Sequence, residues 1–311
     1  SNPIKISPNS IIILIYPLFA SILFYFILAV RHFISDKITN LDALIDFIGK
    51  ENVIGELPFL ELKSKRKEEI SKNIADELLN KTVYEITHST QDFSSICVLG
   101  SRKNVGKTEI SLRLFDKLSK RNLKVCLLDL DYRKRSLTNR FFPETIPEIT
   151  TFDQFYENIE SFKEGKSLFV PAFKISNPQD FFLSDEFNSN IESLKKDYDY
   201  VICDTPPWSL FVDAKIVSKC FEKHLFVIGS NISTFKDIKM FQEDIQDLSN
   251  IFYFFNKFTY FFNFLWYQYE YPYYSGKSYY DYKSYTSLKK DNKILQKIRH
   301  YYFFLLKKIF K

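Results

Sequence analysis

The chain has 311 residues, enough for one sizeable domain with appendages, and carries a formal net charge of +5 at pH 7. The positive charge is concentrated at the end of the chain, where residues 286–311 contain eight basic residues and one acidic residue. The rest of the chain is therefore slightly acidic, which argues against a nucleic-acid-binding protein with a generally basic surface.

The first predicted element is a transmembrane helix over residues 10–30, preceded by a short extracytoplasmic stub at 1–9. The segment contains no charged residue, and about 20 apolar residues at ~1.5 Å each cross a hydrocarbon core of ~30 Å. The basic flank of Arg31, His32 and Lys37 places the rest of the chain on the cytoplasmic side. A signal peptide is the alternative, but the apolar run is too long and no small-residue cleavage site follows it. The start at Ser1 leaves open whether the chain is part of a longer protein.

Residues 31–92 are predicted to be a juxtamembrane linker. A helix and a turn are expected over 31–60, and residues 62–82 are highly charged with apolar residues at helical spacing. The pattern of the sequence changes after this linker, where short apolar runs begin.

An α/β domain is predicted over residues 93–265. Short runs rich in Val, Ile and Leu (SICVLG, KVCLLDLD, DYVICD and HLFVIGS) are separated by amphipathic segments. Such runs are typical of strands covered on both faces, so a mostly parallel, doubly wound sheet flanked by helices is expected. The four cysteines lack metal-ligand spacing, and buried free thiols are expected.

A phosphate-binding loop is predicted where the first run ends, in GSRKNVGKTEIS. Gly106, Lys107 and Thr108 would open a helix, the lysine would reach the phosphates, and the threonine hydroxyl would bind magnesium. Ser101 stands where the pattern usually has its first glycine. The predicted nucleotide-binding residues are Ser101, Arg102, Lys103, Asn104, Val105, Gly106, Lys107 and Thr108. The alternative is a lysine-bearing helix N-terminus without a ligand.

Three acids follow predicted strands. Asp129 and Asp131 end the second run and Asp204 ends the third. Because the carboxyl ends of parallel strands meet at one edge of the sheet, these side chains are expected beside the phosphate-binding loop, where their like charges favour a magnesium ion. The predicted metal ligands are Thr108, Asp129, Asp131 and Asp204. The alternative for the two acids of the second run is a solvated turn.

The motifs LLDLDYR and VICDTPP resemble the second and third nucleotide motifs of bacterial tyrosine kinases. ENVIGELPF, NPQDFF, the pair Asp213–Ala214 and a tyrosine cluster near the end of the chain are similar to features of that family. The resemblance implies ATP and Mg²⁺ as cofactors, a kinase domain over 93–265 and a homo-oligomer. It also implies an inner-membrane location in a bacterium, within a polysaccharide export and polymerisation assembly for capsule or exopolysaccharide.

The resemblance further implies that the tyrosine-rich tail, residues 266–287, is phosphorylated by a neighbouring copy. The expected acceptors are Tyr267, Tyr269, Tyr271, Tyr273, Tyr274, Tyr279, Tyr280, Tyr282 and Tyr285. Asp129 is the candidate base for the phenol, Asp131 and Asp204 hold magnesium, and Lys107 stabilises the transferring group. Asn256 matches a strand-end asparagine that contacts adenine in related ATPases.

The chain departs from the family pattern at two places. Lys103 and Asn104 replace the usual proline and glycine of the loop, where their side chains would crowd the phosphates. The helix around 68–79 lacks the oligomerising Glu-x-x-Arg-x-x-Arg pattern. A catalytically weak nucleotide-binding scaffold and a partition-type ATPase therefore remain alternatives to the kinase.

Residues 288–311 are predicted to form a basic amphipathic helix. It would bind either the anionic inner leaflet or a partner, or else pack on its own domain. A stacking surface for single-stranded nucleic acid is the least favoured reading of the tyrosines, because the basic residues lie beyond them.

Overall fold

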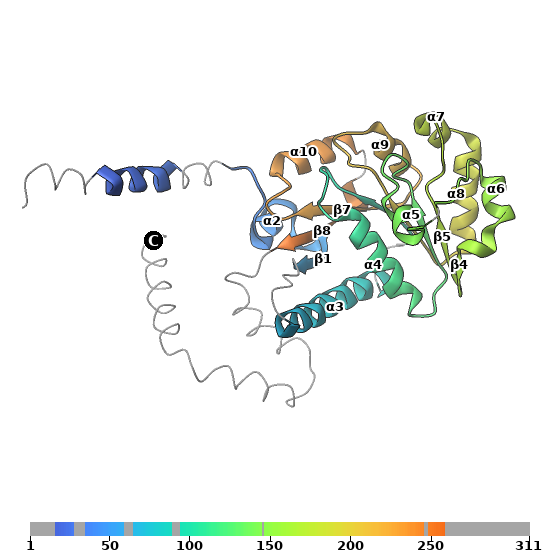
Figure 1. The fold of residues 1–311 in the computed structure, drawn as a ribbon, viewed down its shortest axis with the longest axis horizontal. Coiled ribbons are helices and arrows are strands. Elements are labelled where there is room, and N and C mark those ends of the chain that lie inside the picture. Colours follow the sequence, from blue (N-terminus) through green and yellow to red (C-terminus); the bar gives the residue numbers. More distant parts are fainter. Residues whose placement is uncertain are drawn as a thin grey trace, which may run out of the picture. The chain divides into compact units, whose positions relative to one another are not determined.

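The computed structural model describes residues 16–27, 35–58, 65–88, 94–144, 146–245 and 248–258. These residues contain an eight-stranded sheet flanked by helices (Figure 1). Every strand pairing in this part of the chain is parallel except that of β4 with β5. The prediction of a mostly parallel α/β sheet is therefore confirmed.

The strand order is β1-β8-β7-β2-β6-β3-β5-β4. The strands are β1 (Val53–Pro58), β2 (Ser95–Leu99), β3 (Val125–Asp129), β4 (Lys163–Glu164), β5 (Ser167–Val170), β6 (Tyr200–Asp204), β7 (Lys223–Gly229) and β8 (Ile251–Phe258). The four apolar runs recognised in the sequence correspond to β2, β3, β6 and β7. Because β6 lies between β2 and β3, the ends of these three strands are neighbours.

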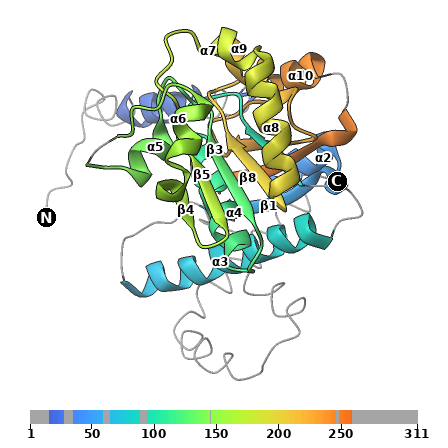
Figure 2. The same cartoon turned by 90° about the vertical axis from the view of Figure 1, so that its right-hand side faces the viewer.

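Helices cover both faces of the sheet. They are α2 (Leu41–Ile48), α3 (Lys65–His88), α4 (Lys107–Ser119), α5 (Ser136–Phe141), α6 (Phe152–Glu157), α7 (Pro178–Phe182), α8 (Asp185–Asp197), α9 (Val212–Ser218) and α10 (Phe235–Asp244). Figures 1 and 2 show α3 and α4 on one face, and α9 and α10 on the other.

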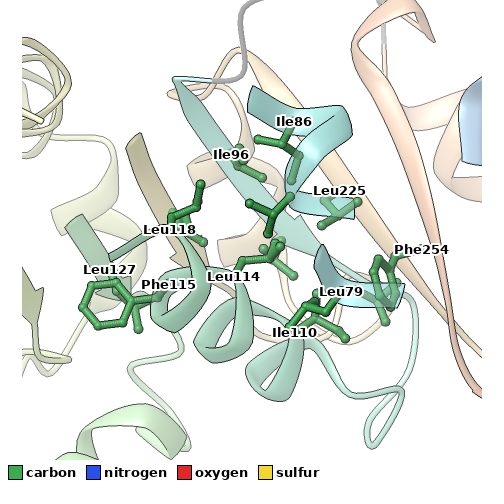
Figure 3. Packing of buried hydrophobic residues seen from close by; sticks show 14 of the residues in the cluster. Leu79, Ile86, Ile96, Ile110, Leu114, Phe115, Leu118, Leu127, Leu225 and Phe254 are labelled. Atoms are coloured by element: carbon green, nitrogen blue, oxygen red, sulfur yellow. The ribbon is translucent and has the colours of Figure 1, made fainter. Parts of the chain in front are cut away.

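The main core lies between the sheet and the pair α3 and α4 (Figure 3). Apolar residues recur every three or four positions along both helices, so each helix turns one continuous apolar side toward the strands. The buried residues that meet there include Leu79, Ile86, Ile110, Leu114, Leu118, Ile96, Leu225 and Phe254. This packing fixes α4, and with it the loop that precedes α4.

Residues assigned to the linker contribute to the fold. β1 pairs with β8 at the sheet edge, and α3 supplies part of the main core. Gly55 permits this packing, because a Cβ there would lie 2.3 Å from Thr82 Oγ1 and 2.5 Å from a ring carbon of Phe254. The strand was not anticipated because its six residues include a glycine and a proline.

The transmembrane prediction falls partly on residues 16–27, which are helical. None of the described helices is both long and apolar enough to cross a bilayer. The remainder of the predicted span, the tyrosine-rich tail and the basic terminal helix lie outside the described residues.

Candidate nucleotide-binding site

The loop over residues 100–106 connects β2 to the first turn of α4. Gly106 is in the left-handed region, with φ 104°. A Cβ at this position would also lie 2.0 Å from Asn256 Nδ2. Glycine is therefore required both by the backbone conformation and by the close approach of β8. A loop that enters a helix N-terminus in this way exposes backbone N–H groups to an anion.

Lys107 and Thr108 bring the first turn of α4 to the end of β6. The Thr108 hydroxyl donates a 2.6 Å hydrogen bond to Asp204 Oδ2, and the Lys107 side chain is buried. Desolvation lowers the pKa of Lys107, while the negative charges of Asp204 and Asp131 act in the opposite direction. The lysine, the threonine and the third motif's acid thus occupy one site.

Asp129 and Asp204 are adjacent across the sheet, as register partners of β3 and β6. Burial, reinforced by the neighbouring charge of Asp129, raises the pKa of Asp204 to about 7. Burial likewise raises the pKa of Asp129 to about 6. Two buried carboxyl groups side by side are unfavourable when both are ionised, so the site favours a cation.

The residues present fit a magnesium ion bound together with phosphates. Asp204 Oδ1 is buried and has no hydrogen-bond partner within the described part of the chain, and the Thr108 hydroxyl lies on the other carboxylate oxygen. No group of three or more Asp, Glu, His or Cys residues in the described ranges is arranged to hold a metal by itself. Mg²⁺ commonly keeps waters and phosphate oxygens beside one or two carboxylates, so this donor set suits it.

Asp129 has a structural environment that the sequence did not reveal. Its Oδ2 accepts two 2.8 Å hydrogen bonds, from the backbone N–H and the hydroxyl of Thr138, and its Oδ1 accepts one from the Asp131 N–H. The side chain has no exposed surface. A base must come within hydrogen-bond reach of the proton it accepts. In this conformation Asp129 instead holds the turn that follows β3.

Asp131 and Arg133 lie on that turn, nearer the surface. Asp131 accepts a hydrogen bond from the Lys134 N–H and keeps 8% exposure. Arg133 forms a two-bond ion pair with the buried Asp213 of α9, at 2.8 and 3.3 Å, and its guanidinium lies 4.6 Å from the Phe211 ring centre. The second motif is thereby joined to the segment after the third.

Asn256 lies against the loop. Its Nδ2 donates to the Val105 carbonyl at 2.8 Å, and its Oδ1 accepts from the Lys257 N–H. Both ends of its amide are therefore bonded to the protein, and the adenine contact stays a prediction.

Side chains of the loop itself point in different directions. Arg102 pairs with Asp237 on α10, Lys103 is exposed, and Ser101 and Val105 are buried. The sequence-based site residues other than the tyrosines are all described, and they surround the ends of β2, β3, β6 and β8. Sequence reasoning missed Thr138, Asp237 and Lys257, each of which bonds a site residue. Asp237 lies three residues after Thr234 at the start of a helix, and this spacing could have predicted a capping box with a fixed carboxylate.

No protein-family model matches the chain. The tyrosine-protein kinase CpsD of Streptococcus pneumoniae serotype 4 is 27% identical over 204 residues, which span 63% of this chain and 88% of that protein. The tyrosine-protein kinase ptk of Acinetobacter johnsonii is 26% identical over 191 residues, which span 59% of this chain and 25% of that protein.

Two solved kinase domains have a similar fold. The kinase domain of Escherichia coli tyrosine kinase ETK has a TM-score of 0.55 at 19% identity and covers 67% of this chain and 91% of its own. The BceF tyrosine kinase domain has a TM-score of 0.55 at 21% identity and covers 71% and 99%. The curated relatives confirm the resemblance noted in the sequence, because they are bacterial tyrosine-protein kinases, and the solved structures share the fold of this chain.

Proposed function

We propose that this chain is an ATP-dependent protein-tyrosine kinase that phosphorylates the tyrosine-rich tail of a neighbouring copy. The observation that carries the proposal is the 2.6 Å hydrogen bond from Thr108 to Asp204, which joins the loop motif to the third motif beside the buried Lys107. Homology to tyrosine-protein kinases supports the reaction type. The run of nine tyrosines between residues 267 and 285 supplies candidate acceptors.

The residues of the site have separate roles in this proposal. The N–H groups of the loop bind the phosphates, and Lys107 stabilises negative charge on the transferring phosphoryl group. Thr108, Asp204 and Asp131 would hold the magnesium ion with its waters. When bound, the ion neutralises charge on the phosphate oxygens and orients them.

Proton removal from the tyrosine is assigned to Asp129, although its carboxylate is enclosed by Thr138. This role requires the turn after β3 to open when the acceptor binds. A carboxyl group with pKa about 6 is a better match to a phenol than an ordinary aspartate, because its affinity for a proton is higher. Asp204 lies next to it but is engaged by Thr108.

We infer that residues 10–30 anchor the kinase in the inner membrane of a bacterium, where it acts in polysaccharide export. The uncharged length of this segment and its basic flank support the anchor. The family resemblance supports the polysaccharide role.

A catalytically weak scaffold is the second candidate. It is favoured by one observation, the replacement of the usual proline and glycine by Lys103 and Asn104, with Asn104 held at φ 63°. Such a protein would bind ATP, and its bound nucleotide would control assembly without labelling the tail.

The proposed function is tested by mass spectrometry of the full chain in detergent after incubation with ATP and Mg²⁺. Phosphotyrosine is expected among residues 267–285. Lys107→Met should remove it, because the transferring group loses its cation, while Lys166→Met, which removes an exposed lysine between β4 and β5, should not.

A mixing experiment tests transfer between copies. Lys107→Met protein should become labelled when mixed with a copy in which the nine tyrosines are phenylalanine. Wild-type protein that binds ATP but gains no phosphotyrosine would reject the kinase in favour of the scaffold.

A further inference from the structure

The middle of the phosphate-binding loop, residues 101–105, holds its shape without glycine. Asn104 nevertheless adopts a left-handed conformation with φ 63°. A left-handed non-glycine residue has a conformational cost, so it persists only where the surroundings impose it. We propose that two outside clamps impose this shape: Asn256 with Lys257 at the end of β8, and Asp237 at the start of α10.

The first clamp bonds two successive carbonyl oxygens of the loop. Lys257 Nζ donates to the Asn104 carbonyl at 2.5 Å, and Asn256 Nδ2 donates to the Val105 carbonyl at 2.8 Å. Asn256 is itself held in place, because its Oδ1 accepts a hydrogen bond from the Lys257 N–H at 2.9 Å and the residue is only 3% exposed.

Fixing a carbonyl also fixes the next N–H group. A trans peptide unit is planar, so its C=O and the following N–H point in opposite directions. When β8 holds the Asn104 and Val105 carbonyls, the N–H groups of Val105 and Gly106 must point away from β8. N–H groups of such a loop are the donors that bind phosphate.

The second clamp holds the side of the loop nearer to β2. Arg102 donates to both carboxylate oxygens of Asp237, at 2.8 and 3.3 Å. Asp237 is fixed in turn by a capping box with Thr234, and its side chain is only 10% exposed. Two parallel bonds between a guanidinium and a fixed carboxylate constrain direction as well as distance.

The segment that follows β6 holds two further carbonyls of the loop. The backbone N–H of Trp208 donates to the Gly100 carbonyl at 3.0 Å, and the backbone N–H of Ser209 donates to the Ser101 carbonyl at 3.2 Å. Protein donors thus occupy the carbonyls of residues 100, 101, 104 and 105. Lys257, Asn256 and Asp237 are therefore positioning residues that pre-organise the loop for a triphosphate. This inference rests on the proposed function for the identity of the ligand, Mg²⁺-ATP.

Within the first clamp, Lys257 is the better residue to change, because its charged side chain makes one hydrogen bond to the loop, to the Asn104 carbonyl. Lys257→Met keeps most of the side-chain length and removes the donor. We expect Mg²⁺-ATP affinity, measured by calorimetry on the full chain in detergent, to fall by about tenfold, the order expected for a lost charged hydrogen bond. Lys257→Arg should recover most of this loss, and Lys166→Met, an exposed lysine remote from the loop, should leave affinity unchanged.

Hydrogen exchange separates loop positioning from a direct contact with the nucleotide. In nucleotide-free Lys257→Met, the amides of residues 101–106 should exchange faster than in the wild type, while those of β3 remain unchanged. Wild-type exchange rates in the loop, or unchanged ATP affinity, would overturn the role of Lys257.

The Asp237 clamp is tested by a double-mutant cycle on ATP affinity with Arg102→Ala and Asp237→Asn. Each change should weaken binding by about threefold to tenfold, and together they should cost little more than either alone, because both break one contact. Additive losses would overturn the second clamp. These readouts need only ATP binding, so a chain that binds ATP without labelling tyrosine would reject the kinase and leave this inference standing. A wild type that binds no ATP would reject both.

Discussion

Two regions at the edge of the sheet bury different kinds of side chain: one buries charged groups and the other buries aromatic rings. At the ends of β2, β3 and β6, a lysine and two carboxyl groups are buried together, and Asp204 Oδ1 has no partner in the described part of the chain. Farther along the edge, α6, α7 and α8 enclose a cluster of rings, which we call the aromatic cluster: Tyr132, Phe152, Phe155, Phe173, Phe181, Phe182 and Phe187.

The comparison shows where stability and function are separated. Burying rings removes a large apolar area from water and stabilises the fold. Burying charges beside one another costs free energy until a ligand compensates for it. The two regions meet after β3, because Tyr132 packs on Phe173 and Phe182 while its neighbour Asp131 is close enough to Lys107 for their charges to interact. The aromatic cluster thus adjoins the turn that carries the polar groups.

The largest expected change is in the aromatic cluster. Phe187 is fully buried, with ring centres of Phe182 and Phe181 at 5.1 and 5.6 Å. Phe187→Ala should lower the free energy of unfolding by about 3–5 kcal/mol, since it leaves a cavity among rigid rings. Urea denaturation measures this loss.

ATP affinity of folded Phe187→Ala should stay within about twofold of the wild type, because distant sites act nearly independently. Leu183→Ala, at a residue that is 64% exposed, should change stability by less than about 0.5 kcal/mol. A Phe187→Ala protein that folds normally but loses ATP binding would show that the two regions are not separable.

Sequence reasoning succeeded where a pattern is local. Each apolar run of about five residues became a buried strand, and the acids that end two of these strands became register neighbours, Asp129 opposite Asp204. Parallel strands bring their carboxyl ends to one edge, so the location of the site followed directly from the order of the motifs.

Sequence reasoning failed where long-range contacts decide. β1 forms because β8 offers it an edge, and residues 36–39 pair with the loop after β7 through contacts such as the Ile38 N–H to the Ser233 carbonyl at 3.0 Å. The sequence of one paired segment does not indicate which distant segment it will pair with. Asp129 was expected at this edge of the sheet, but only the fold places Thr138 on its carboxylate.

The next change tests the polar region. Asp204→Asn keeps an acceptor for the Thr108 hydroxyl and removes the buried charge. A carboxyl group whose pKa is raised to about 7 in the folded state destabilises that state increasingly as pH rises from about 4 to 7. The variant should therefore be more stable than the wild type above pH 7, by about 1–3 kcal/mol, with no advantage below about pH 4.

The same variant should lose Mg²⁺-dependent ATP binding, because the ion loses a charged ligand. Thermal unfolding at pH 5 and pH 8 without nucleotide, followed by calorimetry with Mg²⁺-ATP, measures both effects. Equal stability differences at the two pH values would contradict the raised pKa. A gain in stability combined with a loss of binding would distinguish this region from the aromatic cluster, where Phe187→Ala should lose stability and keep ATP binding.

The smallest expected change lies at the border of the aromatic cluster, in the N-cap of α6. Thr151 Oγ1 accepts a hydrogen bond from the Gln154 N–H at 3.3 Å. Thr151→Ala leaves this donor without its cap and should lower the free energy of unfolding by about 1 kcal/mol, while Thr151→Ser should retain most of it.

A double variant decides whether the aromatic cluster acts as one unit. Phe152, the first residue of α6, lies 6.4 Å from Phe187 between ring centres. If the cap and the rings stabilise the same packed unit, Thr151→Ala should cost less in a Phe187→Ala background than in the wild type, because the cavity has already loosened α6. Urea denaturation of the four proteins measures the coupling. Strict additivity would mean that α6 is held by its own cap and backbone bonds, and that the stability of this region arises from separate helices instead of one cooperative cluster.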